Sequence, residues 1–193
     1  MKKYNVFLLS VMLVIAACHT KKKVPEKKFI SVLSLIQSQV AHIDTSLYSI
    51  VKIITTDSLP GDTSYIPREE FRAIAKDFLS IPDLSDKKVA ERYKVETLFD
   101  KTINRVIITY TPENLANEEI KKQELLVTPS VANGDIVNDI IINQVISNRD
   151  SFMQKNMLWQ MDKSFQVVTT LQKPGKPEKT TTLKVTWNEG ADQ

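Results

Sequence analysis

The sequence predicts an α+β fold in which N-terminal helices pack on a curved antiparallel β-meander of about six strands. Two observations support this prediction. Apolar residues recur at helical spacing between residues 29 and 92, whereas from Tyr93 onward they alternate with polar residues at a period of two. After Tyr93, only the segment 113–122 is long enough for a crossover helix, so consecutive strands are expected to pair as neighbours.

The first predicted helix covers residues 29–54, where apolar residues follow alternating steps of four and three. Such a stripe is one face of an amphipathic helix, which we expect to pack on the sheet. Because aspartate and serine compete for backbone hydrogen bonds, the segment 44–46 is a place where this helix can kink or restart. The members of the stripe are Phe29, Leu33, Ile36, Val40, Ile43, Leu47, Ile50 and Ile54.

Two shorter helices are predicted after this stripe. Residues 57–63, which include Pro60 and Gly61, read as a turn. Pro67 then opens the second helix, whose first turn carries acidic residues that suit the helix dipole and which ends before Pro82. A third, short helix is expected within residues 85–92.

The predicted strands are short segments rich in β-branched and aromatic residues, separated by turn signals. Asn133 and Gly134 form a hairpin-turn signal before the longest segment, and residues 173–179 form a loop between the last two. The segments are 93–99, 106–110, 125–127, 136–146, 152–161, 165–171 and 180–187.

The segment 136–146 is apolar on both of its faces, which is unusual for a strand with one face in water. One face carries Ile136, Ile140, Ile142 and Ile146, and the other carries Val137, Ile141 and Val145. Helices are expected to cover one face. The other face requires a curled sheet, a second chain or an apolar ligand. The candidate ligand or partner surface is therefore Val137, Ile141 and Val145, or the opposite set with Ile140 and Ile142.

The N-terminus has the layout of an export signal. Lys2 and Lys3 precede an apolar run over residues 6–17, which is too short to span a bilayer as a helix. The run ends in Ile15, Ala16, Ala17 and Cys18, and Cys18 is the only cysteine, so it cannot form an internal disulfide. This ending resembles the lipobox of bacterial lipoproteins, in which the cysteine is lipidated and becomes the first mature residue.

The resemblance implies how the chain is organised and where it resides. Residues 1–17 would be a signal peptide, residues 18–28 a lipidated flexible tether, and residues 29–190 a single globular domain, helical over 29–92 and a sheet over 93–188. Lipid chains hold through burial of about 0.8 kcal/mol per CH₂. His19 stands where an aspartate favours inner-membrane retention in this class, so we expect the outer membrane, on the periplasmic side rather than the cell surface.

Charge excludes one class of partner. The chain has a formal net charge of +3, but Lys2 and Lys3 leave with the signal and five of the remaining lysines lie in the tether. The folded part is therefore mildly acidic, without a basic patch interleaved with aromatic residues, so no nucleic-acid partner is expected.

The sequence offers little that points to catalysis or metal binding. His42, Asp44 and Ser46 are residue types found in catalytic sites, but nothing nearby supplies an oxyanion site or an oriented base. Met153, Met157, Trp159 and Met161 form a cluster that suits Cu(I) or, more simply, fills a core. No phosphate-binding glycine loop is present. We therefore expect no enzyme activity, no cofactor and no metal.

Three functions remain after these exclusions. The first is a non-enzymatic binding or accessory module of the cell envelope, with a protein or envelope component as partner, self-association included. The second is a carrier of an apolar ligand such as a lipid, an analogy at the level of the fold alone. The third, a hydrolase acting on the envelope, ranks last because the acidic and histidine groups lack a usable arrangement.

Overall fold

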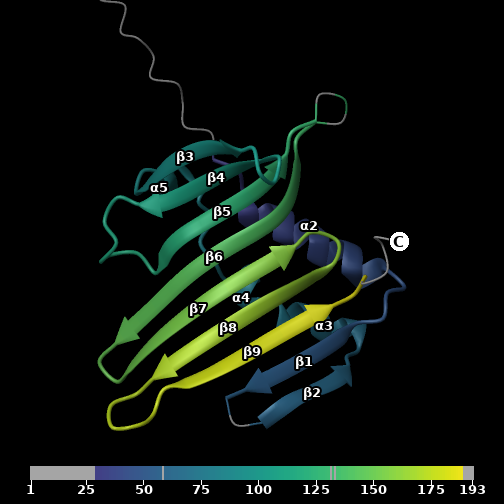
Figure 1. The fold of residues 1–193 in the computed structure, drawn as a ribbon, viewed down its shortest axis with the longest axis vertical. Helices are drawn as coiled ribbons and strands as arrows, with labels where there is room; N and C mark the ends of the chain where they lie inside the picture. Colours follow the sequence, from purple (N-terminus) through teal and green to yellow (C-terminus); the bar gives the residue numbers. More distant parts are fainter. Residues whose placement is uncertain (1–28, 58, 131, 133, 189–193) are drawn as a thin grey trace, which may run out of the picture.

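The computed structural model describes residues 29–57, 59–130, 132 and 134–188. Its main element is one antiparallel sheet of nine strands, in the order β2-β1-β9-β8-β7-β6-β5-β4-β3 (Figure 1). The strands are β1 (Val51–Thr56), β2 (Leu59–Tyr65), β3 (Tyr93–Asp100), β4 (Arg105–Pro112), β5 (Ile120–Thr128), β6 (Ile136–Asn148), β7 (Ser151–Gln160), β8 (Ser164–Gln172) and β9 (Lys179–Thr186).

Most of the sheet is a meander, because β3 to β9 each pair with the next strand along the chain. The exception is the hairpin of β1 and β2, which joins the far edge of the meander. There Val51 lies opposite Thr186, so β1 pairs with the last strand of the chain. The sheet is twisted and open, and its two edge strands are β2 and β3 (Figure 1).

Four helices are present in the described residues: α2 (Val32–Thr45), α3 (Arg68–Ile74), α4 (Lys76–Leu79) and α5 (Lys87–Ala90). In Figure 1, α2, α3 and α4 lie behind the sheet, on the same side. None of these helices is both long and apolar enough to cross a membrane.

The N-terminus of α2 is well determined by local hydrogen bonds. The Ser31 hydroxyl accepts a hydrogen bond from the backbone N–H of Ser34 at 3.1 Å, as an N-cap residue does. The same hydroxyl donates to Asp83 at 2.9 Å, and Ser85 also donates to this carboxylate. Burial raises the pKa of Asp83, but these hydrogen bonds outweigh it and hold the pKa below its usual value.

Several side-chain contacts connect the helices to the sheet. Gln39 of α2 makes two hydrogen bonds of 2.9 Å with Asp162 in the turn between β7 and β8. Asp77 of α4 accepts a hydrogen bond from Lys155 of β7 at 2.8 Å, in an ion pair whose side chains are both mostly buried. These contacts fix the position of α2 and α4 over the middle of the sheet.

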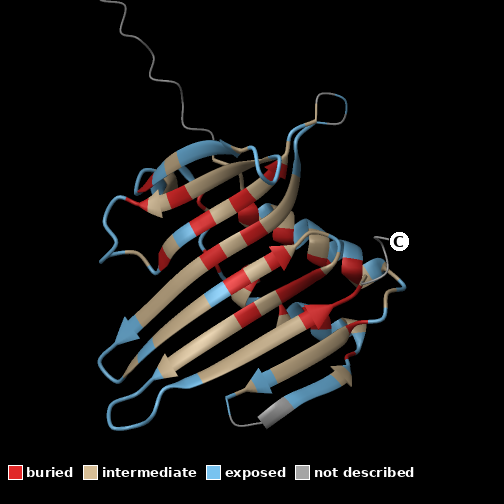
Figure 2. Cartoon of the chain, in the orientation of Figure 1, coloured by how far each residue is buried: buried red, intermediate tan, exposed pale blue. Residues whose placement is uncertain are grey.

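The core is centred on five aromatic rings, which we call the aromatic cluster. Its members are Phe71 (α3), Phe78 (α4), Trp159 (β7), Phe165 (β8) and Trp187. The rings of Trp159 and Phe165 stack at 5.2 Å, and the Phe78 ring meets the Trp159 ring edge-on at 5.1 Å. Buried positions in Figure 2 concentrate on the strand segments that lie over the helices. The apolar face of α2 belongs to the same core, with Val32, Ile36, Val40 and Ile43 at 2% exposure or less.

The expected fold class is confirmed in its coarser part. The antiparallel meander is present, but it has nine strands instead of about six, and the molecule is mostly β. The division into a helical half and a sheet half is wrong, because β1 and β2 lie within residues 29–92 and belong to the sheet.

The predicted helix over residues 29–54 is also wrong beyond Thr45, where α2 ends. The Ser46 hydroxyl donates a hydrogen bond to the Ile43 carbonyl at 3.0 Å. A continued helix would need this carbonyl to accept a hydrogen bond from a backbone N–H of the next turn. Leu47, a member of the predicted stripe, is 96% exposed. The next residues are rich in β-branched side chains and pair with β9 as β1, since tertiary pairing outweighs the apolar spacing.

The remaining elements agree only in part with the sequence-based expectations. The segment 57–63 is not only a turn, because β2 starts at Leu59. The helix starting after Pro67 is present but breaks at Ala75 into α3 and α4. The segment 113–122 contains no helix, and β5 begins at Ile120. Gly134 has a φ of +74°, as a turn glycine does, while Asn133 lies outside the described residues.

Replacing Ile36 or Ile43 with alanine should lower the free energy of unfolding by about 2–5 kcal/mol, because both side chains are fully buried. Chemical denaturation measures this loss. Leu47→Ala is the matched control from the same apolar stripe and should change stability by less than about 0.5 kcal/mol. Equal effects of the three substitutions would contradict the end of α2 at Thr45.

Candidate functional site

The two candidate sets on β6 have different environments. Ile140 and Ile142 are fully buried and belong to the core beneath the helices. Ile141 and Val145 alternate with them and are only half-buried, on the opposite face of the sheet. In the described residues the helices lie on one side only, so we call the side of Ile141 the uncovered face (Figure 1). Ile140 and Ile142 therefore have a packing role.

Val137 is not on the uncovered face, contrary to the prediction. The pairing of β5 with β6 shifts there: Leu126 lies opposite Asp139, but Val127 lies opposite Val137, so Asn138 is skipped. This β-bulge reverses the alternation, and Val137 packs against the core. The Asn138 side chain accepts a hydrogen bond from the Thr128 hydroxyl, which holds the bulge.

The register brings further apolar side chains next to Ile141 on the uncovered face. Leu158 lies directly opposite Ile141, and Leu126 is its diagonal neighbour on β5. On the far side of Leu126 the same row continues to Ile107 and Leu98, and on the far side of Leu158 a diagonal step leads to Val168. We call this row the apolar band. It consists of Leu98, Ile107, Leu126, Ile141, Leu158 and Val168 and crosses β3 to β8.

Polar side chains border the band and are held in place by one another. Glu124 accepts a hydrogen bond from Thr109 at 3.3 Å and forms an ion pair with Lys122 at 3.0 Å. On the same side, the Asn143 amide donates to the Asn156 amide oxygen. On the other side, the Gln160 amide donates to the Asp139 carboxylate at 3.4 Å. The band is thus a row of apolar side chains within a polar border, half-buried except at Leu98, which is 65% exposed.

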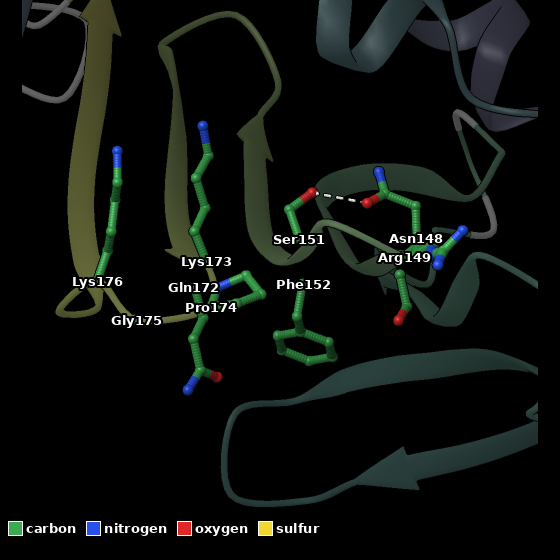
Figure 3. A pocket seen from close by; sticks show the side chains of 10 residues that line it. Asn148, Arg149, Ser151, Phe152, Gln172, Lys173, Pro174, Gly175 and Lys176 are labelled. Atoms are coloured by element: carbon green, nitrogen blue, oxygen red, sulfur yellow. Dashed lines mark hydrogen bonds between the residues drawn. The ribbon is translucent and has the colours of Figure 1, made fainter.

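The loops at one end of the sheet form a pocket of about 350 Å³ between the β6–β7 turn and the β8–β9 loop (Figure 3). It carries three cations, Arg149, Lys173 and Lys176, together with the partly exposed ring of Phe152. In Figure 3, Lys173 and Lys176 point in one direction, whereas Phe152 points in the opposite one. The charges therefore do not converge with the ring on one bound group.

A second pocket, of about 340 Å³, lies beside the start of β3 and includes Tyr93 and Glu118. Burial raises the pKa of the Tyr93 hydroxyl well above its usual value, and the negative charge of Glu118 adds to this. Glu118 in turn forms an ion pair with Arg92. Arg92, Tyr93 and Glu118 are therefore paired with one another, and Glu119 accepts a hydrogen bond from Gln144 outside the pocket.

The residues considered for chemistry are separated by other partners. Asp44 forms an ion pair with Arg72 at 2.8 Å, and the Ser46 hydroxyl is bonded to the Ile43 carbonyl. The His42 ring lies 6.1 Å from the Tyr48 ring. Among the described residues, no hydrogen bond joins His42, Asp44 and Ser46, and no group of three His, Cys, Asp or Glu side chains has metal-binding geometry.

The methionine cluster is divided between core and periphery. Met157 and Trp159 are fully buried, and Trp159 stands in the aromatic cluster. Met161 packs against this core, whereas Met153 is half-buried on β7. Their role in the described fold is packing.

The chain matches no family model, no curated protein and no solved structure. Sequence reasoning had selected Ile141 but missed the other five members of the apolar band. Most of them lie within short apolar runs, such as residues 106–108 and 125–127, and only the strand register shows that they share one face and lie side by side.

Replacing Val137 with aspartate should lower the free energy of unfolding by about 2 kcal/mol or more, since it places a charge against the core. The matched variant Val145→Asp, on the uncovered face, should cost less than about 1 kcal/mol. Urea denaturation compares the two. Equal losses would show that Val137 does not lie on the core side of the bulge.

Proposed function

We propose that the protein is a lipoprotein anchored through Cys18 to the periplasmic side of the outer membrane, where it acts as a non-enzymatic binding or accessory module of the cell envelope. The observation that carries the binding role is the apolar band on the uncovered face. A stable sheet does not need apolar side chains on a face in water, whereas a contact with a partner does.

The N-terminal helices serve in this proposal as a permanent cover for the other face. Their aromatic side chains fill the space over β7 and β8, so that part of the face is occupied by the chain itself. For the same reason, a carrier of apolar ligands has less support than a binding module. The space in which such a ligand would lie between helices and sheet is occupied by Phe71, Phe78 and Trp159.

The start of the described chain indicates where the tether would join the domain. The Phe29 ring stacks on Tyr110 of β4 at 5.0 Å, and the backbone N–H of Ile30 donates to the Tyr110 hydroxyl at 3.1 Å. Burial raises the pKa of this hydroxyl. A tether joined at Phe29 is therefore attached next to the β3 edge, and the uncovered face remains accessible from the periplasm.

Replacing Cys18 with serine should release the mature protein from the membrane fraction, because the lipid chains supply the membrane affinity. Fractionation of cells followed by immunodetection measures the distribution. A variant of the tether that keeps the cysteine, Lys22→Ser, is the control and should stay with the membranes. If the Cys18→Ser variant still partitions with membranes, the proposed lipid anchor at Cys18 is contradicted.

The binding surface is tested by thiol labelling of Ile141→Cys. With Cys18 lipidated, the introduced cysteine is the only free thiol in the chain. We expect maleimide to label this cysteine in the purified protein and to label it poorly in isolated envelopes, where a partner covers the band. Thr170→Cys on β8, on the same face but outside the band, should be labelled in both. Equal labelling of Ile141→Cys in both samples would contradict a partner at this surface.

A further inference from the structure

The two edges of the sheet differ in how well they are protected against pairing with another strand. The β2 edge carries Pro60 and Gly61, and its register with β1 shifts between Ile54 and Thr56. Proline, glycine and irregular pairing are devices that block edge-to-edge association. The β3 edge has none of them: its eight residues pair with β4 without a register shift and include no proline or glycine.

The β3 edge also presents a regular row of backbone groups. The Arg92 carbonyl accepts a hydrogen bond from the backbone N–H of Glu113 at 2.8 Å. In an antiparallel pair, every second residue of a strand bonds to the neighbouring strand, counting from such a residue. Lys94, Glu96 and Leu98 therefore direct their backbone groups toward β4, whereas Val95, Thr97 and Phe99 direct theirs outward. Pro112, which has no N–H, lies opposite Tyr93, one of the positions that does not bond to β4.

The outward backbone groups are without partners in the described residues. No hydrogen bond within these residues joins the backbone of Val95, Thr97 or Phe99 to anything beyond the edge. The neighbouring side chains are unusually exposed for apolar groups, with Leu98 at 65% and Phe99 at 46%. An exposed, regular and partly apolar edge is a template for one more strand.

We propose that this additional strand is β3 of a second copy of the chain, paired antiparallel about Thr97. In this register Val95 lies opposite Phe99 of the second copy, an aliphatic–aromatic pair that covers the exposed ring. Lys94 lies opposite Asp100 of the second copy, and the twofold symmetry makes each of these pairs twice. The three outward residues of each copy then exchange backbone hydrogen bonds with those of the other.

Charge selects this register over its neighbours. Moving the twofold axis to Glu96 places two Glu96 carboxylates opposite each other. Moving it to Leu98 places Glu96 opposite Asp100 of the second copy, and symmetry repeats that repulsion. Of these three axes, only the one at Thr97 brings opposite charges together and keeps like charges apart. An axis at Val95 would also place Lys94 opposite Glu96 of the second copy, but it overlaps only residues 93–97, whereas the axis at Thr97 overlaps residues 94–100. The edge is thus complementary to itself, which is what a symmetric pair of identical chains requires.

The proposal goes beyond the proposed function, because it stands whether or not the apolar band binds a partner. It leaves the uncovered face of both copies free. Anchoring of both copies in one membrane would raise their effective concentration, so a contact of modest strength suffices.

The proposal is tested by disulfide cross-linking of the mature, lipidated protein in membranes. Thr97→Cys places its thiol on the twofold axis, where paired strands bring Cα atoms within disulfide range. We expect a dimer of twice the mass on a non-reducing gel and its loss on reduction. The matched control is Thr63→Cys, an exposed threonine on the β2 edge, which should remain a monomer.

A second pair of variants tests the hydrogen bonding without a cross-link. Thr97→Pro removes an outward N–H that has no partner within one copy, so the fold and melting temperature should be kept while the dimer in detergent micelles dissociates. Thr63→Pro should remain dimeric. Monomeric wild-type protein, equal cross-linking at Thr63 and Thr97, or cross-linking of Thr97→Cys to a different protein would each overturn the proposal.

Discussion

The contact between the aromatic cluster and the middle of the sheet determines most of what this molecule can do. Phe71 and Phe78 meet Trp159 and Phe165 edge-on, and Trp187 closes the group from the end of β9. Because these rings come from helices on one side and strands on the other, they decide which face of the sheet is sealed. The opposite face is uncovered in the described part of the chain as a direct result.

An open sheet sealed on one side has three remaining surfaces: the uncovered face and two edges. The face carries the apolar band with its polar border, and the edges differ in protection, since proline and glycine interrupt β2 but not β3. The polar loops at the end of the sheet add pockets whose charged groups do not converge (Figure 3). Among the described residues, apolar side chains therefore lie on the uncovered face and at the β3 edge, and the charged side chains of these loops do not converge on one point.

How much of this was predictable depends on whether a feature is local. The change from helical to strand period near Tyr93 correctly marked the start of β3, and the β-branched segments marked five of the later strands to within one or two residues of each end. The apolar stripe from Phe29 to Ile54 predicted a helix that is too long, because its spacing continues through Ser46. There the Ser46 side chain bonds to the Ile43 carbonyl and α2 ends, and β1 follows from Val51. Spacing alone does not show that Val51 pairs with Thr186, a partner from the other end of the chain.

The candidate surface illustrates the same limit at the level of single residues. Ile141 was recognisable because it lies in a strand that is apolar on both sides. Val137 was assigned to the wrong face because of the bulge at Asn138. This bulge arises from the pairing of β6 with β5, and the alternation of apolar residues in the sequence does not reveal it. Leu98, Ile107 and Leu126 become neighbours only through the register of three strands.

The aromatic cluster also gives the protein a built-in optical reporter. Trp159 and Trp187 are the only tryptophans in the chain, and both indoles are almost completely buried, at 0% and 3% exposure. Their fluorescence therefore responds to water reaching the junction of helices and sheet. It is insensitive to events confined to the uncovered face or to the β3 edge. Loss of the fold and loss of association consequently have different spectral signatures in the unlabelled protein.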